Sequence, residues 1–289
     1  MAALFGPGGN SDSFAAEGHK HTYEAPKWLA ERGLFAYEYQ AGNGVRGSDE
    51  VYAKIGEEAE KYGIAMSLHA PYYISLSSPE PAKRQSSIGH IKKSLHAARL
   101  LGADIIVIHC GSVLKMSREE AMRLSAETLC QVLEETAGSV YEGIRLGVET
   151  MGKRGQLGTL QEVIELCRLD ARLYPVVDFA HMYARELGGV FGEGDKDGYR
   201  RVFDQIANGL GDDKAKYLHC HFSRIEYTSA GERRHLTLAD NSSFGPDYRA
   251  LIEVIAEEGL SPRIICESAG TMAEDAKIMQ DYYLSLVAG

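Results

Sequence analysis

The chain has 289 residues, 44% of them hydrophobic, and its 41 acidic and 31 basic residues give a formal net charge of −10. This charge excludes a general attraction to nucleic acid, although a local basic surface remains compatible with it. No apolar run reaches the ~18 residues of a membrane span, the N-terminus lacks a signal peptide, and five cysteines without a Cys-x-x-Cys pair favour a reducing compartment. We therefore expect a cytoplasmic protein.

Short apolar runs recur along the chain at intervals that predict buried β-strands. The predicted strands are residues 3–6, 34–39, 64–69, 104–109, 144–149, 173–178, 217–222 and 263–267. Runs without a polar alternation are typical of parallel sheets that are covered on both faces.

Between these runs, apolar residues recur at steps of three and four, which predicts amphipathic helices. The predicted helices are residues 25–32, 49–62, 81–101, 117–141, 160–169, 197–208, 246–258 and 272–286. Glycine often follows a predicted helix before the next strand, as a helix C-terminus requires. Eight strands that alternate with eight helices predict an α/β fold, a single-domain (β/α)8 TIM barrel over residues 1–289.

Polar residues lie in or at the end of six successive predicted strands. They are His69, His109, Glu149, Asp178, His219 and Glu267. Because the C-terminal ends of barrel strands open onto one face, we expect these side chains to converge. Three imidazoles and three carboxylates would be costly to bury together without cations, so the pattern predicts a metal site.

The stretch from Val176 to His181 shows why the single residues are ambiguous. Asp178 follows a predicted buried strand, and His181 comes three residues later, in a loop or a first helical turn. Taken singly, the aspartate can cap a helix and the histidine can pack in a core. The recurrence of such pairs along the chain favours metal binding. His221 and His235 also follow or end strands and are further candidates.

A mixed set of imidazoles and carboxylates suits zinc, with manganese or iron as alternatives, better than magnesium. Six or more ligands exceed what one ion needs, so we expect two or three ions that share a carboxylate. Clusters of this kind typically hydrolyse phosphate esters, since one ion activates water and another stabilises the leaving oxygen.

Six short segments resemble, in order and spacing, the successive motifs of the endonuclease IV family of apurinic/apyrimidinic endonucleases. These segments are residues 67–76 (SLHAPYYISL), 107–111 (VIHCG), 148–150 (VET), 177–181 (VDFAH), 217–219 (YLH) and 266–268 (CES). The family belongs to the xylose-isomerase-like TIM barrels and carries three zinc ions. The resemblance therefore implies a metal-dependent phosphodiesterase that incises damaged double-stranded DNA at abasic sites during base excision repair, by attack of metal-bound hydroxide on phosphorus.

The resemblance also implies roles for individual residues. His69 and His109 would hold one zinc ion, and Glu149 would bridge it to a second. Tyr72 matches a tyrosine beside the metal cluster of the family. Glu149 and Tyr72 are therefore the expected catalytic residues.

The remaining ligands would complete two further zinc sites. Asp178, His219 and Glu267 would complete the shell of the second ion. His181 and His235 would belong to a third ion.

The chain departs from the family where an Asp-x-His motif is expected. It reads Arg233-Arg234-His235 there, so the third ion loses its aspartate. An arginine cannot ligate a metal, because its guanidinium stays charged and has no free lone pair. We expect Arg233 and Arg234 to bind substrate phosphates instead.

Two residues are available to replace the missing aspartate. Glu232 reaches the site if the loop register shifts by one residue. His221 faces the same side of its strand as His219, because the two are separated by one residue. We expect His221 to be the replacement, since it needs no change in the path of the loop.

A sugar isomerase or epimerase of the same superfamily is the alternative function. Such an enzyme would hold a single divalent ion on Glu149, Asp178, His219 and Glu267. One ion has no use for so many further imidazoles, which would then contact the sugar or the ligands. A binding protein that keeps the metal cluster without turnover is a third possibility.

Basic residues on the predicted loops above the strand ends favour a phosphate substrate. They are Arg46, Lys115, Lys153, Arg154, Arg224, Arg233 and Arg234. Such side chains can hold phosphates despite the acidic total, although surface loops commonly carry lysine and arginine.

Overall fold

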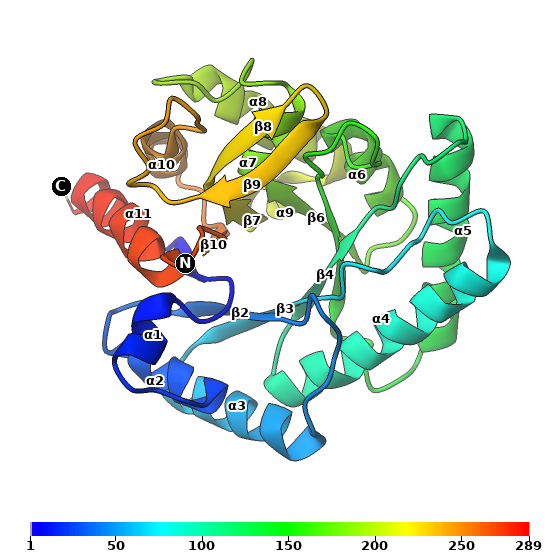
Figure 1. Ribbon diagram of the computed structural model, residues 1–289, viewed down its shortest axis with the longest axis horizontal. Helices are drawn as coiled ribbons and strands as arrows, with labels where there is room; N and C mark the ends of the chain where they lie inside the picture. Colours follow the sequence, from blue (N-terminus) through cyan, green and yellow to red (C-terminus); the bar gives the residue numbers. More distant parts are fainter. Residues whose placement is uncertain (1, 289) are drawn as a thin grey trace.

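The computed structural model describes residues 2–288, and its eight parallel strands form a nearly closed barrel with helices around it (Figure 1). The barrel strands are β1 (Leu4–Pro7), β2 (Ala36–Gln40), β3 (Ala65–His69), β4 (Ile105–His109), β5 (Arg145–Glu149), β6 (Leu173–Asp178), β7 (His219–Phe222) and β10 (Arg263–Cys266). They pair in the order β1-β10-β7-β6-β5-β4-β3-β2. The predicted (β/α)8 barrel is therefore confirmed.

The barrel closes where β1 meets β2. Gly8 forms a parallel bridge with Glu38, and the Gly9 amide donates to the Glu38 carbonyl at 3.0 Å. A Cβ on Gly6 would lie only 1.8 Å from the carbonyl oxygen of Ala36. Glycine is therefore required at this position for β1 to approach β2.

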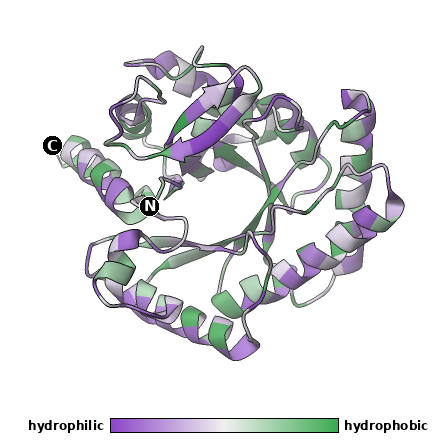
Figure 2. Ribbon diagram, viewed as in Figure 1, coloured by the Kyte–Doolittle hydropathy of each residue, from purple (hydrophilic) through white to green (hydrophobic). Residues whose placement is uncertain are grey.

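Helices connect the strands and cover the outside of the barrel (Figure 1). They are α1 (Asp12–Ala16), α2 (Ala25–Ala30), α3 (Asp49–Tyr62), α4 (Pro81–Leu101), α5 (Arg118–Thr136), α6 (Leu160–Cys167), α7 (Phe179–Arg185), α8 (Lys196–Leu210), α9 (Asp212–Lys216), α10 (Tyr248–Glu257) and α11 (Met272–Val287), with a 3₁₀ turn at Thr22–Glu24. In Figure 2 the long helices α3 and α4 carry both hydrophobic and hydrophilic residues, as helices with one buried side do. Among residues 2–288, no helix combines the length and the apolar character needed to cross a bilayer.

All eight predicted strands and all eight predicted helices are present, with ends that differ by a few residues. The largest difference is at α5, which ends at Thr136, because Ala137 is extended and Gly138 has a φ of 61°. The short helices α1, α7 and α9 were not predicted. Neither was the antiparallel hairpin of β8 (Arg224–Thr228) and β9 (Gly231–Leu236), which follows β7.

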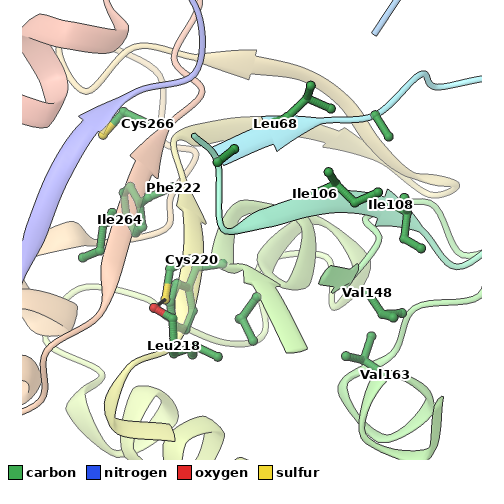
Figure 3. Packing of buried hydrophobic residues seen from close by; sticks show 14 of the residues in the cluster. Leu68, Ile106, Ile108, Val148, Val163, Leu218, Cys220, Phe222, Ile264 and Cys266 are labelled. Atoms are coloured by element: carbon green, nitrogen blue, oxygen red, sulfur yellow. Dashed lines mark hydrogen bonds between the residues drawn. The ribbon is translucent and has the colours of Figure 1, made fainter. Parts of the chain in front are cut away.

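Successive residues of each barrel strand point alternately toward the helices and into the barrel. On β4, Ile106 and Ile108 belong to the large core between strands and helices (Figure 3). Ile105 and Val107 belong to a separate small cluster inside the barrel. His109 is the next inward position, so this alternation brings its imidazole to the barrel mouth.

Candidate metal centre

Four neighbouring strands end in a polar residue that faces the barrel interior. These residues are His69 on β3, His109 on β4, Glu149 on β5 and Asp178 on β6. All but His109, which is partly exposed, are buried. The convergence that the sequence predicted is therefore present at the C-terminal mouth.

Glu149 lies at the centre of this group and is fully buried. Its Oε2 atom lies 3.4 Å from Nε2 of His69 and 3.2 Å from Nε2 of His109. Its Oε1 atom lies 2.8 Å from Nδ1 of His221. One oxygen of this carboxylate thus faces two imidazoles and the other oxygen faces a third, as expected of a ligand that bridges two ions.

The first subsite consists of His69, His109 and Glu149, whose ligand atoms all lie within 4.8 Å of one another. Nδ1 of His69 lies 2.8 Å from the carbonyl oxygen of Ala70. A proton donated to this carbonyl leaves Nε2 with a lone pair that faces Glu149. This is the arrangement of a metal-ligating histidine.

The second subsite consists of Glu149, Asp178, His221 and Glu267, whose ligand atoms also lie within 4.8 Å. Oδ1 of Asp178 accepts a hydrogen bond of 2.7 Å from the His181 amide and thereby caps α7. Oδ2 of Asp178 is buried and has no hydrogen-bond partner. One oxygen of this aspartate therefore caps a helix, and the other is available to a cation.

His219 does not join the second subsite as expected. In the strand register it pairs with Val176, whereas His221 pairs with Asp178 at the strand end. His219 therefore lies one inward position deeper, where its Nε2 is 3.0 Å from Glu38. The residue at the second subsite is His221, which also excludes it as the replacement for the missing third-ion aspartate.

The third subsite consists of Asp178, His181, Glu232 and His235. Asp178, His181 and His235 have ligand atoms within 4.8 Å of one another. Nδ1 of His181 lies 2.9 Å from the Thr150 carbonyl, while Nε2 lies 3.5 Å from Oε2 of Glu232. Of the two candidates for the missing ligand, Glu232 is thus the one that faces this subsite.

A β-bulge in the hairpin explains how Glu232 reaches the cavity. Arg234 pairs with Glu226, but the next pair joins Tyr227 to Glu232, so that Arg233 is an extra residue. In a regular strand Glu232 and His235 would face opposite sides, because they are three residues apart. The extra residue cancels this offset, and both side chains line the cavity.

The two arginines of the bulge point away from the cavity. Both have more than 60% of their side chains exposed, and both pair with Glu226. The expectation that Arg233 and Arg234 bind substrate phosphate is therefore not supported by this geometry.

The hairpin is fastened to the loop between β5 and α6. The Arg154 amide donates to the Ala230 carbonyl at 3.1 Å, and the Glu232 amide donates to the Gly152 carbonyl at 3.3 Å. Gly231 has a φ of 99°, and a Cβ there would lie 2.2 Å from the Gly152 oxygen. This close contact fixes the backbone of Glu232 next to the third subsite.

The mouth forms a cavity of ≈440 Å³ that residues from all three subsites line. Its lining residues are His69, Tyr72, His109, Met151, Lys153, Gln156, His181, Glu232, His235 and Glu267. The Tyr72 ring lies 5.3 Å from that of His69 and 5.7 Å from that of His109. Tyr72 therefore stands at the predicted place, beside the first subsite.

Charges at the mouth perturb its ionisable groups strongly. Burial alone would raise the pKa of Glu149, but the adjacent imidazoles lower it well below its ordinary value. Burial alone would lower the pKa of His69, but contact with Glu149 and other carboxylates raises it to about 9. The pKa of His181 is likewise raised against burial to about 9, chiefly by Asp178 and Glu232.

Several buried carboxylate oxygens at the mouth accept no hydrogen bond, which bears on whether cations fit this site. Oε2 of Glu149, Oδ2 of Asp178 and Oε2 of Glu232 are all buried and accept no hydrogen bond, although each lies 3.2 to 3.5 Å from an imidazole nitrogen. Leaving such atoms unpaired is costly, and a cation removes the cost. The donor set of imidazole nitrogens and carboxylate oxygens therefore fits divalent metal ions at each subsite.

The sequence interpretation missed Glu38, which is fully buried on β2 and contacts His219 and His221. The one feature of the sequence that could have indicated its role is an acidic residue within the predicted strand 34–39. Alternation places Glu38 between Ala36 and Gln40 on the inward side, but its partners lie about 180 residues away in the sequence.

The fold and the strand-end residues can be compared with known proteins. A sequence profile described as xylose isomerase-like TIM barrel matches residues 26–282. The chain belongs to this family. The chain is 31% identical over 264 residues to an uncharacterized protein of Methanocaldococcus jannaschii, and the match covers 91% of this chain and 92% of that protein.

A second relative is "Probable endonuclease 4" of Acholeplasma laidlawii. It is 29% identical over 206 residues, which are 68% of this chain and 65% of that protein. The match thus spans slightly less than two thirds of the endonuclease.

Two solved structures resemble the chain to the same extent. Endonuclease IV from Thermus thermophilus superimposes with a TM-score of 0.67 at 19% identity, covering 92% of this chain and 94% of that one. A D-tagatose 3-epimerase-like protein also gives 0.67, at 20% identity, with 91% and 92% covered. At such identities the likeness establishes the fold.

Proposed function

We propose that this protein is a metal-dependent phosphodiesterase that incises DNA at abasic sites. The observation that carries the proposal is the division of the Glu149 carboxylate between two sets of imidazoles. A single ion needs no such sharing, whereas adjacent ions on phosphate esters typically share a carboxylate. The proposal includes a role in DNA repair and a location in the cytoplasm.

Zinc is the proposed metal, since imidazole with carboxylate is its common ligand set. His69 and His109 hold the first ion together with Glu149, which it shares with the second subsite. Bound ions would activate a water and neutralise charge on the phosphate. Glu232 supplies the acid of the third subsite, with His181 and His235.

Tyr72 is the proposed second catalytic residue. Burial and nearby carboxylates raise the pKa of its phenol to about 12. The hydroxyl therefore keeps its proton at neutral pH and is available to donate a hydrogen bond to a substrate oxygen in the cavity.

Four cations around the mouth support a nucleic-acid substrate. Arg46, Lys115, Lys153 and Arg154 are exposed, and within residues 2–288 none of them forms an ion pair. Arg224, by contrast, is engaged with backbone carbonyls of the loop after β9. Cations without ion-pair partners on the loops of the mouth suit a polyanion such as DNA.

A single-metal sugar epimerase is the second candidate. The second subsite alone, with Glu149, Asp178, His221 and Glu267, is a four-ligand set that suits one ion. The likeness to an epimerase-like structure, equal in TM-score to that for endonuclease IV, supports this alternative.

The test is incubation of the protein with a DNA duplex that carries an abasic-site analogue. We expect incision 5′ to the analogue, loss of incision with a chelator, and recovery with Zn²⁺ or Mn²⁺. His109→Ala should abolish incision, because it breaks the first subsite. His96→Ala is the matched control, since His96 is half-exposed on α4 and pairs with Asp49.

Absence of incision with either metal, together with turnover of a ketose that survives His109→Ala, would overturn the proposal in favour of the epimerase. Such an enzyme needs only the second subsite.

A further inference from the structure

Glu38 forms a second layer of contacts directly beneath the second subsite. It is fully buried, and Ser67 Oγ donates a hydrogen bond of 2.9 Å to its Oε2. Nε2 of His219 lies 3.0 Å from the same oxygen. Nε2 of His221 lies 3.0 Å from Oε1. Each oxygen of this carboxylate thus faces one imidazole.

His221 is consequently held between two carboxylates. Its Nε2 faces Glu38, and its Nδ1 faces Glu149 at 2.8 Å and Glu267 at 3.7 Å. A neutral imidazole carries one proton. In this structure Nε2 makes no hydrogen bond, but when an ion takes the Nδ1 lone pair the proton must lie on Nε2, where Oε1 of Glu38 is 3.0 Å away.

A carboxylate beneath the barrel mouth is costly for folding alone. Burying an ion pair commonly contributes no more stability than apolar residues of the same size would. Inward positions of barrels are usually filled by apolar side chains, as Val107 and Val176 are here. An acid at Glu38 therefore points to a role in orienting its neighbours.

We propose that Glu38 is a positioning residue that holds His221 with Nδ1 toward the second subsite and thereby sets the affinity of that subsite for a divalent ion. This inference rests on the metal binding of the proposed function, but it requires neither DNA nor sugar as substrate. Glu38 itself lines no part of the mouth cavity. Its contact with the second subsite is made through His221.

Glu38→Gln tests this role, because it keeps the volume and removes the charge. Zinc affinity is measured by equilibrium dialysis, and Co²⁺ is used as a spectroscopic probe of the same ligands. We expect Glu38→Gln to weaken one ion by about 10–100-fold, as loss of an outer partner of a ligating histidine does. The visible absorption of the Co²⁺ form should change, and a second ion should bind as before.

Ser67→Ala is the matched control, since it removes one hydrogen bond to Glu38 but keeps the carboxylate. Its zinc affinity should stay within about threefold of the unsubstituted protein, well short of the loss expected for an outer partner. Thermal unfolding of the metal-free proteins checks folding. If Glu38→Gln fails to fold, Glu38→Asp takes its place, and its carboxylate, one methylene further from His221, should give a smaller loss.

Unchanged zinc affinity and unchanged Co²⁺ absorption in the folded Glu38 variant would overturn the positioning role alone. Absence of bound metal in the unsubstituted protein would overturn the proposed function as well. Equal weakening in Ser67→Ala and Glu38→Gln would indicate a general packing effect and would also overturn the inference.

Discussion

The two ends of the barrel hold cavities of nearly equal volume, ≈440 Å³ at the C-terminal mouth and ≈450 Å³ at the N-terminal end. At the N-terminal end, the carboxylate of Asp104 pairs with two guanidiniums, those of Arg145 and Arg263. At the mouth, carboxylates outnumber permanent cations, and Glu149 and Asp178 each have a buried oxygen that accepts no hydrogen bond. The two cavities therefore cannot be distinguished by volume, but they differ in whether their buried carboxylate oxygens accept hydrogen bonds.

Glu149→Gln should have the largest effect on the mouth. The neutral amide cannot serve two cations, so we expect loss of two ions and of activity together. The loss should exceed the about 10–100-fold that removal of an outer partner causes. Metal analysis after dialysis and the incision assay measure it, and the exposed residue Glu142 provides Glu142→Gln as control. Full metal content in Glu149→Gln would remove the bridging role.

Glu232→Gln should affect only the third subsite. We expect this ion to bind about 10-fold more weakly, because one charged ligand becomes neutral while His181 and His235 remain. Arg233→Ala is the control from the adjacent position and should leave all ions in place, since Arg233 is exposed and paired with Glu226. Titration with a competing chelator measures both. A loss in Arg233→Ala but not in Glu232→Gln would contradict the bulge argument.

A rise in pH should increase the affinity of the mouth for metal ions and decrease the stability of the metal-free fold. His69 and His181 have pKa values near 9 in the metal-free protein, above the ordinary 6.5. Their protonated forms stabilise the fold below about pH 6.5, and this contribution is lost as the pH rises through 9. A metal ion must displace those protons, so its affinity should rise over this range by about tenfold per pH unit for each proton displaced.

Calorimetry in buffers of different ionisation enthalpy counts the protons that metal binding releases. A zinc affinity that is constant between pH 6.5 and 9 would contradict this prediction.

Asp104→Asn, at the other end of the barrel, should have the smallest effect. Asp104 is partly exposed, and its ion pairs with Arg145 and Arg263 are accessible to solvent. We therefore expect a loss of at most about 1 kcal/mol in the free energy of unfolding. Metal content should not change. A loss of metal in Asp104→Asn would show that the two ends are coupled.

The fold was predictable from the sequence because each strand and helix carries its own signal. Apolar runs, helical periodicity and glycines at helix ends are all local. The polar strand ends His69, His109, Glu149 and Asp178 followed from the same pattern, since a barrel sends every strand end to one face. These residues are the ones that the structure brings together.

The rest of the site depends on register, which no single segment contains. The choice between His219 and His221 is fixed by the pairing of β7 with β6. The hairpin was missed because β8 and β9 are rich in charge and lack an apolar run, as loops do. Glu38 was missed because its partners come from β7, on a distant part of the chain.

The bulge at Arg233 has a consequence for how this lineage is compared with others. If residues 233–235 are matched to the Asp-x-His motif by spacing alone, Arg233 takes the place of the aspartate and the motif lacks its metal ligand. In this chain the extra residue of the bulge places the acid three residues before His235 and still on the same side of the strand. Deleting either arginine of the pair should leave a flat strand in which Glu232 stands two residues before His235, which is the spacing of the Asp-x-His motif. The spacing of two residues in the sequence therefore does not by itself tell which side of a strand they share.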